Sequence, residues 1–432
     1  MQTNVTAERI RALAEQANRL AQQGNQAASR SVWEQLLALS PEHALGLNYL
    51  GQEALLRGDF GIARDLLQRA ITNEPSFALA HANLARAKRH LGDSVGALTA
   101  LDSALKLEPQ AFPAHLEKAF IFEELGQERN AALAYERALR LVPGQATLPA
   151  GLQAQLAHAQ RIVAENKNQL SRFLDERLKE VRPKQDSRGM SRFDESLQIA
   201  TGQKPFFQPR PLMFPITGLP NIAFFDRQDF AWAASVEAAS HDIRQELDGV
   251  IADDAAGFVP YVQTADGEPV GQFAPLDRKL DWGAYFLWQH GQPLLEHAAR
   301  CPKTMAALAH APQAEVSRRA PAAFFSALKP HTHIPPHNGA TNCRLTVHLP
   351  LIIPEHCAIR VGNHVRPWTP GELLIFDDTM EHEAWNRSDH LRVVLIFDIW
   401  HPLLSEVEKI MVKTALEGMI AYYGESASLG EL

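Results

Sequence analysis

The chain has 432 residues, of which 46% are apolar and 21% charged, and its formal net charge is −8. This length predicts two or three domains with a sizeable core. The acidic balance argues against nucleic acid or an anionic membrane as a main partner, because both require a basic surface.

Three cysteines do not make a disulfide framework, and they fit a reducing compartment. The first residues, MQTNVTAERIRALAEQ, contain no apolar signal region. No run of 18 apolar residues occurs in the sequence, so we expect no membrane-spanning segment. These observations together predict a cytoplasmic protein.

A period of 34 residues organises the first third of the chain. The period is marked by two sets of residues, Gly24, Gly58, Gly92 and Gly126, and Pro41, Pro75, Pro109 and Pro143. Glycine suits the turn that ends one helix, and proline ends the next. The pattern resembles the tetratricopeptide repeat, a helix–turn–helix unit. Three clear repeats cover about residues 44–143, and residues 10–43 form a weaker first unit.

Such an array is expected to present a concave surface that binds a peptide or protein, although a purely structural or dimerising array is the alternative. We expect helices to continue to residue 182, so that residues 1–182 form the helical domain. Residues 183–204 are polar and less regular, which predicts a linker. The second domain is then expected to cover residues 205–432.

The middle of the chain opens with a proline-rich segment, residues 205–222, which we expect to be extended. A helix is predicted over residues 230–247, and a strand followed by a helix over residues 281–308.

Histidines gather in the last third of the chain. Four fall within 18 residues and two follow later: His331, His333, His337, His348, His382 and His390. Neutral imidazole is a ligand for Zn, Cu, Fe and Ni. Prolines at 330, 335 and 336 argue against a helix here, so residues 330–337 are expected to form a loop before a strand.

The strand after that loop is predicted at residues 344–349. Arg344, Thr346 and His348 lie on the face opposite an aliphatic stripe, which favours a polar pocket over a half-exposed strand. Further short runs at residues 358–361, 372–376 and 391–397 are rich in β-branched and aromatic residues. Closely spaced short strands indicate a jelly roll or another closed β-fold.

The spaced motifs of this region are specific. They are HxGxTNxRLxxHLxL at His337–Leu351, IFDDxxEHExWN at Ile375–Asn386, an arginine six residues later, and DxWHP at Asp398–Pro402. They resemble the aspartyl/asparaginyl β-hydroxylase family of Fe(II)- and 2-oxoglutarate-dependent oxygenases. The resemblance implies a double-stranded β-helix, or jelly roll, behind the helical repeats.

Site residues follow from the resemblance position by position. It implies that His337 and His382 bind iron. It also implies that Ser326, His348 and Arg392 hold the cosubstrate 2-oxoglutarate. An Arg fork suits a carboxylate, and a hydroxyl can add a hydrogen bond. Trp282, in a WxxxxxWQxG spacing, is a further cosubstrate residue by resemblance, or simply a core residue.

Two departures from the usual oxygenase pattern stand out. Gly339 occupies the position of the usual third ligand, a carboxylate. The resembled family shares this absence, so a two-histidine centre is expected, and nearby acidic residues (Asp377, Asp378, Glu381, Glu383) are the alternative ligands. Thr346 stands where some relatives have an additional cosubstrate-binding arginine, and we expect that Arg344 compensates.

The resemblance implies an enzyme that consumes O2 and 2-oxoglutarate and hydroxylates an Asp- or Asn-type side chain, with Arg392 and the two iron-binding histidines at the reaction centre. The repeat array favours a peptide or protein substrate over a free amino acid or another small molecule. A halogenase also lacks the carboxylate, but its surrounding motifs differ. A peptide-binding scaffold with a silent oxygenase domain is the alternative outside enzymes.

Overall fold

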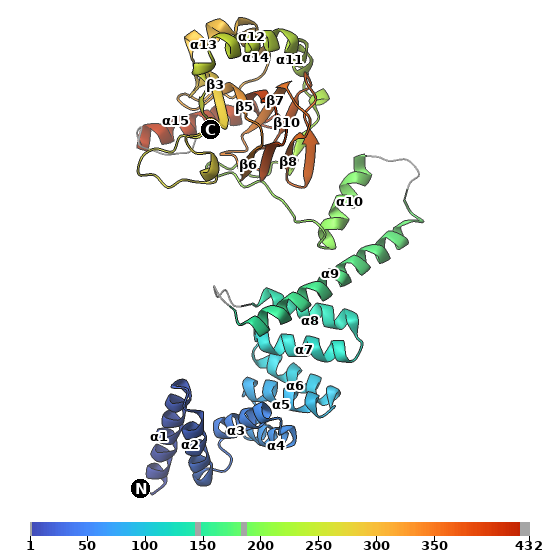
Figure 1. The fold of residues 1–432 in the computed structure, drawn as a ribbon, viewed down its shortest axis with the longest axis vertical. Helices are drawn as coiled ribbons and strands as arrows, with labels where there is room; N and C mark the ends of the chain where they lie inside the picture. Colours follow the sequence, from blue (N-terminus) through green and yellow to red (C-terminus); the bar gives the residue numbers. More distant parts are fainter. Residues whose placement is uncertain (1, 143–147, 183–187, 424–432) are drawn as a thin grey trace. The chain divides into compact units, whose positions relative to one another are not determined.

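The structure is a computed structural model that describes residues 2–142, 148–182 and 188–423. The chain divides into two compact units, Met1–Gln203 and Lys204–Leu432 (Figure 1). The division falls one residue before the expected start of the second domain at 205.

The first unit consists of paired antiparallel helices, as the 34-residue period predicts. They are α1 (Gln2–Gln22), α2 (Gln26–Leu39), α3 (Ala44–Arg57), α4 (Phe60–Asn73), α5 (Ala78–His90), α6 (Ser94–Leu107), α7 (Phe112–Glu124), α8 (Glu128–Arg140) and the longer α9 (Ala150–Leu178). The four periodic glycines all have positive φ, between 68° and 83°, which explains why glycine recurs at the turns. Pro143 lies outside the described residues.

Small residues let the paired helices approach closely. The periodic alanines Ala63, Ala97 and Ala131 are at most 1% exposed. An added Cβ on Gly51 would lie 2.6 Å from the side chain of Leu67. The core of this unit is therefore built from contacts within one repeat and between neighbouring repeats.

Helix α10 (Arg188–Ala200) lies inside the segment that we expected to be an irregular linker. Met190 and Leu197 are both partly buried, and their spacing of seven residues, about two helical turns, places them on one helix face. The polar composition of this segment hid that pattern.

The second unit contains two antiparallel sheets. The larger has the order β1 (Phe224–Phe225), β10 (Leu374–Phe376), β7 (Arg344–Ile352), β12 (Arg392–Trp400), β5 (Ala323–Leu328), β3 (Trp282–Gln289) and β2 (Val259–Pro260), with β4 (Gln292–Pro293) paired to β3. The smaller has the order β6 (Thr332–His337), β11 (His382–Asn386), β8 (Cys357–Val361) and β9 (His364–Pro367). The strands predicted over residues 344–397 are confirmed.

One apolar cluster lies between the two sheets and includes Leu328 and Val394 from the larger sheet and Ile359 from the smaller. Two facing antiparallel sheets with a shared core are the basic layout of the expected jelly roll. A second cluster lies on the other face of the larger sheet, under helices α11 (Ala233–Ala238), α12 (Ser240–Asp253), α13 (Leu295–Arg300) and α14 (Pro302–Leu308). Helix α15 (Glu406–Tyr423) ends the described chain.

The two faces of β7 separate as the alternation predicts. Leu345, Val347 and Leu349 are fully buried in the cluster under the helices. The intervening residues Thr346 and His348 line a cavity on the opposite face. One strand thus joins the core to the site.

The segment before β7 differs from its prediction, because residues 332–337 form strand β6 rather than a loop. The strand lies at the edge of the smaller sheet and pairs with β11 alone. This edge strand tolerates Pro335 and Pro336 because they lie at a register shift, where the regular pairing with β11 is interrupted. The prolines excluded a helix correctly, but they did not exclude an edge strand.

Candidate active site

Two histidines face each other across one strand pair. His337, the last residue of β6, is paired in register with His382, the first residue of β11. Their ring centroids lie 3.9 Å apart. The sheet register therefore fixes the separation of the two imidazoles, although 45 positions separate them in sequence.

Each imidazole uses its Nδ1 atom to contact the backbone. His337 Nδ1 lies 2.7 Å from the carbonyl oxygen of Pro335, and His382 Nδ1 lies 3.1 Å from that of Met380. A carbonyl oxygen can only accept, so each Nδ1 carries the proton and each Nε2 keeps a lone pair. Metal-ligating histidines are oriented in this way.

Burial keeps both rings neutral. His337 and His382 are 9% and 7% exposed. Burial, followed by the neighbouring His382 ring, lowers the pKa of His337 well below its ordinary value. Burial also lowers the pKa of His382 to about 4. Neutral imidazole is the form that binds a metal.

Arg392, the first residue of β12, is a buried cation without a counter-ion. It is 1% exposed, and no carboxylate of the described residues forms an ion pair with it. Its Nη1 atom lies 3.4 Å from Ser326 Oγ, and its Nε has no hydrogen-bond partner within the described chain. Burial lowers the pKa of Arg392 to about 9. Such a site calls for an anionic ligand, because an unpaired buried charge is costly.

Aromatic side chains hold this arginine and its neighbours in place. Trp282 donates its indole N–H to Ser326 Oγ at 3.0 Å. The Arg392 guanidinium carbon lies 4.2 Å from the ring centroid of Trp368. Trp368 donates its own N–H to His348 Nδ1 at 3.2 Å, so the proton of His348 must be on Nε2. His348 can therefore donate a hydrogen bond to a ligand.

Arg344 is held differently from Arg392. Its guanidinium forms ion pairs with Asp398 and with Asp378, the latter at 3.4 Å. Its positive charge is therefore already balanced by carboxylates of the chain. Its role toward a cosubstrate stays a prediction.

All of these side chains line one cavity of about 1000 Å³. The structure thus brings together every site residue that the sequence predicted: Trp282, Ser326, His337, Arg344, His348, His382 and Arg392. A pair of neutral imidazoles, an unpaired guanidinium and nearby hydroxyl and N–H donors can hold a metal ion beside a small anion.

Comparison with known proteins agrees with this geometry. Residues 237–402 match the family model described as Aspartyl/Asparaginyl beta-hydroxylase. These residues form a domain of the aspartyl/asparaginyl β-hydroxylase family. Residues 15–76, 50–107 and 83–146 match a tetratricopeptide-repeat model.

Two curated relatives illustrate the similarity of the hydroxylase domain. The mouse aspartyl/asparaginyl beta-hydroxylase is 41% identical over 144 residues, which is 32% of this chain and 19% of the mouse protein. The ornithine lipid ester-linked acyl 2-hydroxylase of Rhizobium tropici is 36% identical over 190 residues, which is 43% of this chain and 63% of that protein. The chain thus spans about a fifth of the first relative and under two thirds of the second.

Among solved structures, the crystal structure of MamA matches 31% of this chain and 77% of its own, with a TM-score of 0.28 and 20% sequence identity. No helix of the described residues is long and apolar enough to cross a bilayer.

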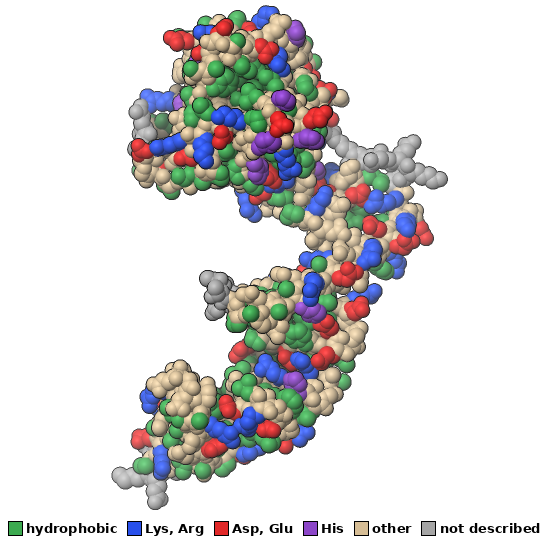
Figure 2. Space-filling view, viewed as in Figure 1, with side chains coloured by type: hydrophobic (Ala, Val, Ile, Leu, Met, Phe, Trp, Pro, Cys, Tyr) green, Lys and Arg blue, Asp and Glu red, His purple; other side chains and the backbone are tan. Residues whose placement is uncertain are grey.

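Two further histidines of the hydroxylase domain, His331 and His333, lie at its surface. His331 contacts Asp389 at 2.9 Å, and His333 contacts Glu383 at 2.7 Å, with the histidine side chains 67% and 53% exposed. Figure 2 shows histidine, acidic and basic side chains gathered on the visible face of this unit. Both histidines contact acidic side chains at the surface.

Three of the four alternative acidic ligands are engaged elsewhere, whereas Asp378 lines the same cavity as the two histidines. Glu381 and Glu383 both pair with Arg360, and Asp377 accepts hydrogen bonds from Thr379. Over the described ranges, no group of three or more His, Cys, Asp or Glu side chains is arranged to hold a metal. The two facing imidazoles of His337 and His382 stay the predicted metal ligands, with Asp378 as a neighbour in the cavity.

Sequence reasoning missed three aromatic residues of the cavity region. Besides Trp368, Tyr261 stacks near Trp282 with centroids 4.1 Å apart, and Phe273 contacts the His337 ring at 4.6 Å. None lies in a motif that marks the site. Trp368 gave the clearest signal in the sequence, because it lies in a Pro-Trp-Thr-Pro segment just before a predicted strand.

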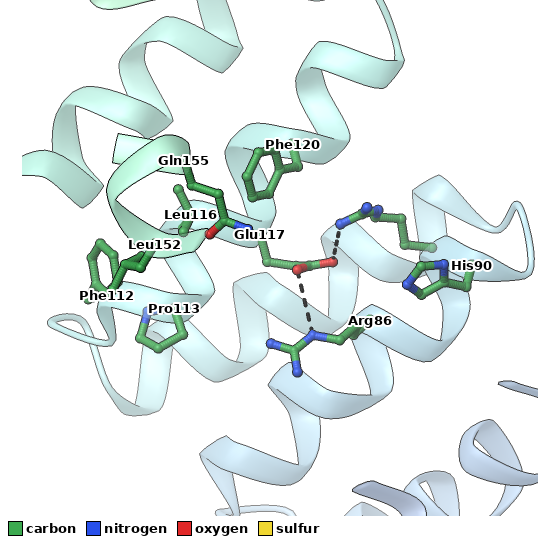
Figure 3. Close-up of a pocket in the computed structure, with 10 residues that line it drawn as sticks. Arg86, His90, Phe112, Pro113, Leu116, Glu117, Phe120, Leu152 and Gln155 are labelled. Carbon is green, nitrogen blue, oxygen red and sulfur yellow. Dashed lines mark hydrogen bonds and ion pairs between the residues drawn. The ribbon is translucent and has the colours of Figure 1, made fainter. Parts of the chain in front are cut away.

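A second cavity, of about 610 Å³, lies in the repeat array between helices α5, α7 and α9 (Figure 3). One side is apolar and includes Phe112, Leu116 and Leu152. On the other side, buried Glu117 accepts from Arg89 at 2.7 Å and lies 3.7 Å from Arg86. The array therefore offers a recess with both apolar and charged walls.

Proposed function

We propose that the second unit is an Fe(II)- and 2-oxoglutarate-dependent dioxygenase that hydroxylates an Asp- or Asn-type side chain of a polypeptide. The observation that carries the proposal is the buried, unpaired Arg392 in the same cavity as a pair of neutral, oriented imidazoles. A cation without a counter-ion beside a metal-ligand pair fits a metal-chelating anion with a second carboxylate.

The donor set fits the proposed iron. His337 and His382 would hold the ion through Nε2, since each Nδ1 already contacts a carbonyl oxygen. Two protein ligands leave several coordination positions open for other ligands. When bound, iron and 2-oxoglutarate would supply oxygen activation, with the cosubstrate converted to succinate and CO2.

The protein's own groups bind and orient the cosubstrate. Arg392 offers its free donors to a carboxylate, and Trp282 fixes the Ser326 hydroxyl that lies beside it. His348 adds an Nε2 donor that Trp368 holds in a defined tautomer. Aromatic walls exclude water, so these hydrogen bonds are made in a medium of low dielectric constant.

The array supports a polypeptide substrate or partner. Tetratricopeptide arrays bind extended segments on their concave surface. The recess between α5 and α7 has apolar walls for a side chain and an arginine, Arg86, that is held only loosely by Glu117 at 3.7 Å. We infer that it contributes to recruitment of the substrate or of a partner protein.

A second candidate is hydroxylation of a small molecule, such as a lipid acyl chain. The relative from Rhizobium tropici favours it, because that protein's name describes an acyl 2-hydroxylase and 63% of its length is covered. Product analysis by mass spectrometry after incubation with peptides or with lipids would separate the two candidates.

The first test is anaerobic titration of the purified chain with Fe(II) and 2-oxoglutarate. The proposal predicts a visible charge-transfer band, followed by succinate formation when oxygen is admitted. His337→Ala should lose both, while His331→Ala should keep both because His331 is an exposed partner of Asp389. A folded protein that gives neither band nor succinate would favour a silent scaffold.

A further inference from the structure

Helix α15 buries one of its faces and leaves the opposite face exposed. Val412 and Leu416 are each 3% exposed and pack into an apolar cluster of the second unit. On the other side of the helix, Val407, Ile410 and Met411 are each 65% exposed. Large apolar side chains gathered on one exposed face mark an interaction site.

The exposed face extends over about four helical turns and carries no charge. Residues advance by about 100° each around a helix, so one stripe of α15 collects six exposed, uncharged residues. This stripe, the open face of α15, consists of Val407, Ile410, Met411, Thr414, Gly418 and Ala421.

The open face has large side chains in its first half and small residues in its second half. A Cβ added to Gly418 would meet no described atom within 4 Å, so the face is hollow at that position. Tyr422, which is 83% exposed, lies at the rim of the face, just beyond Ala421. The face is therefore raised at one end and recessed between its centre and the other end.

A second copy of the same helix fits this shape when the two helices run antiparallel. With a two-fold axis at Thr414, residues equally far from position 414 face each other. Ile410 then meets the partner's Gly418, and Val407 meets the partner's Ala421. A large residue thus meets a small one in both halves. A parallel pair would set Gly418 against Gly418 and leave a gap, which close packing disfavours.

The charges beside the open face also balance in an antiparallel pair. Lys413 and Glu417 lie on one flank of the helix. Glu417 accepts from the backbone N–H of Ser317 at 3.0 Å through Oε1, and Lys413 forms no ion pair with the described residues. In the pair, the two lysines lie at the centre of the flank with one glutamate beyond each. Each lysine is about 3 Å along the axis from the partner's Glu417, and the cluster has no net charge.

A lipid surface fits this helix less well than a second copy does. Helices that lie on a bilayer carry lysine and arginine along their polar side. The polar side of α15 has three glutamates and two lysines: Glu406, Glu408, Glu417, Lys409 and Lys413. The whole chain has a formal net charge of −8. The self-complementary shape therefore favours a protein contact.

We propose that α15 is a dimerisation helix, whose open face pairs antiparallel with the same face of a second copy of this chain. The contact lies at the edge of the candidate active site, because Ile420 of the same helix lines that cavity. One helix pair is a small interface, so we expect a dissociation constant of about 10 µM. The inference does not depend on the reaction that the cavity carries out.

Sedimentation velocity of the full chain between about 1 and 100 µM tests the proposal. We expect the 47.9 kDa monomer at the lowest concentration and twice that mass at the highest. Gly418→Ile fills the hollow without a clash inside one copy, so the dimer should weaken at least about 10-fold. The double variant Ile410→Gly/Gly418→Ile exchanges the two facing residues and should restore the dimer.

Gly249→Ile is the matched control. Gly249 is exposed in α12, and a Cβ there would likewise meet no described atom within 4 Å, so the dimer should persist. Circular dichroism melting at about 1 µM, where the chain is mostly monomeric, should give the same midpoint for Gly418→Ile and wild type. This measurement separates a lost contact between copies from a damaged fold.

Several results would overturn the proposal. A chain that stays monomeric at about 100 µM would do so. A dimer that Gly418→Ile leaves unchanged would place the contact elsewhere, for example in the repeat array. Tighter association of Gly418→Ile, or a double variant that stays monomeric, would contradict the facing of large and small residues. Flotation of the monomer with phosphatidylcholine vesicles, strengthened by Gly418→Ile, would assign the open face to lipid instead.

Discussion

Two buried charges, one in each unit of this chain, differ in whether the fold neutralises them. In the array, Glu117 is 8% exposed, and its carboxylate is paired with Arg89 and lies near Arg86. In the hydroxylase domain, Arg392 is 1% exposed and has no carboxylate partner among the described residues. A charge that the fold neutralises supports structure, whereas a charge that the fold leaves unpaired is available to a ligand.

The largest expected effect comes from His382→Ala, which removes one of the two proposed metal ligands. We expect succinate formation to fall to background, because one protein ligand does not replace two in holding the ion. Binding of a partner by the array should be unchanged, since each repeat contacts only its neighbours. Turnover assays and pull-down with the full chain measure the two properties. Full activity in His382→Ala would refute the assignment of the metal site.

The next largest effect is a difference in stability between variants of the two buried arginines of the hydroxylase domain, Arg344 and Arg392. Arg344→Met leaves Asp378 and Asp398 buried without their shared cation and should lower the free energy of unfolding by about 3–5 kcal/mol. Arg392→Met removes an unpaired charge and should not lower the stability of the ligand-free chain. Urea denaturation measures both variants.

The two variants should rank in the reverse order when their affinity for 2-oxoglutarate is measured. Arg392→Met should weaken binding by about 30-fold or more, which is about 2 kcal/mol, while Arg344→Met should have the smaller effect. An equal loss of affinity in both variants would mean that Arg344 also binds the cosubstrate.

A smaller effect is expected in the array, from Ala97→Leu in α6. Ala97 is fully buried between helices, so the larger side chain should cost about 1–3 kcal/mol by overpacking. Val95→Leu on the same helix, at a residue that is 76% exposed, is the matched control and should leave stability unchanged. Calorimetric melting of the full chain would show a lower transition for Ala97→Leu alone. No shift would argue against the close helix packing.

The last prediction is a gradual change with pH rather than a single shift, and it concerns His401. Burial lowers the pKa of His401 to about 4, below the ordinary value of 6.5, and the side chain is 1% exposed. The unfolded chain therefore binds a proton more readily below pH 6.5, so acidification favours unfolding. Between pH 6.5 and 4, wild type should lose up to about 1.4 kcal/mol per pH unit relative to His401→Asn. Denaturation at several pH values measures the free energy of unfolding of both proteins. An equal change with pH in wild type and His401→Asn would contradict this prediction.

Local patterns in the sequence predicted much of both units. The array was visible from glycines and prolines, because each marks a turn or a helix end in every repeat. The cavity-facing side of β7 was visible from the alternation of Arg344, Thr346 and His348 with aliphatic residues. The side chains that resemblance assigned to the site do meet in one cavity, which is what the physical argument required.

Long-range contacts were the part that the sequence did not reveal. The ion pair between Arg344 and Asp398 joins residues 54 positions apart. No local pattern around Arg344 predicts this partner. Trp368 contacts Arg392 and His348 only because β10, β7 and β12 are neighbours in the sheet. Strand β6 was missed for another reason, since the tolerance for proline depends on whether a strand lies at an edge.

That edge strand has a consequence for solubility. An open sheet edge can pair with another chain and so start aggregation. Neither Pro335 nor Pro336 has a backbone N–H, and the two lie at a register shift of this edge strand, directly beside His337. The prolines thus hinder β-pairing of another chain with the strand that carries His337, a proposed metal ligand. Replacing both with β-branched residues should make the folded protein prone to self-association.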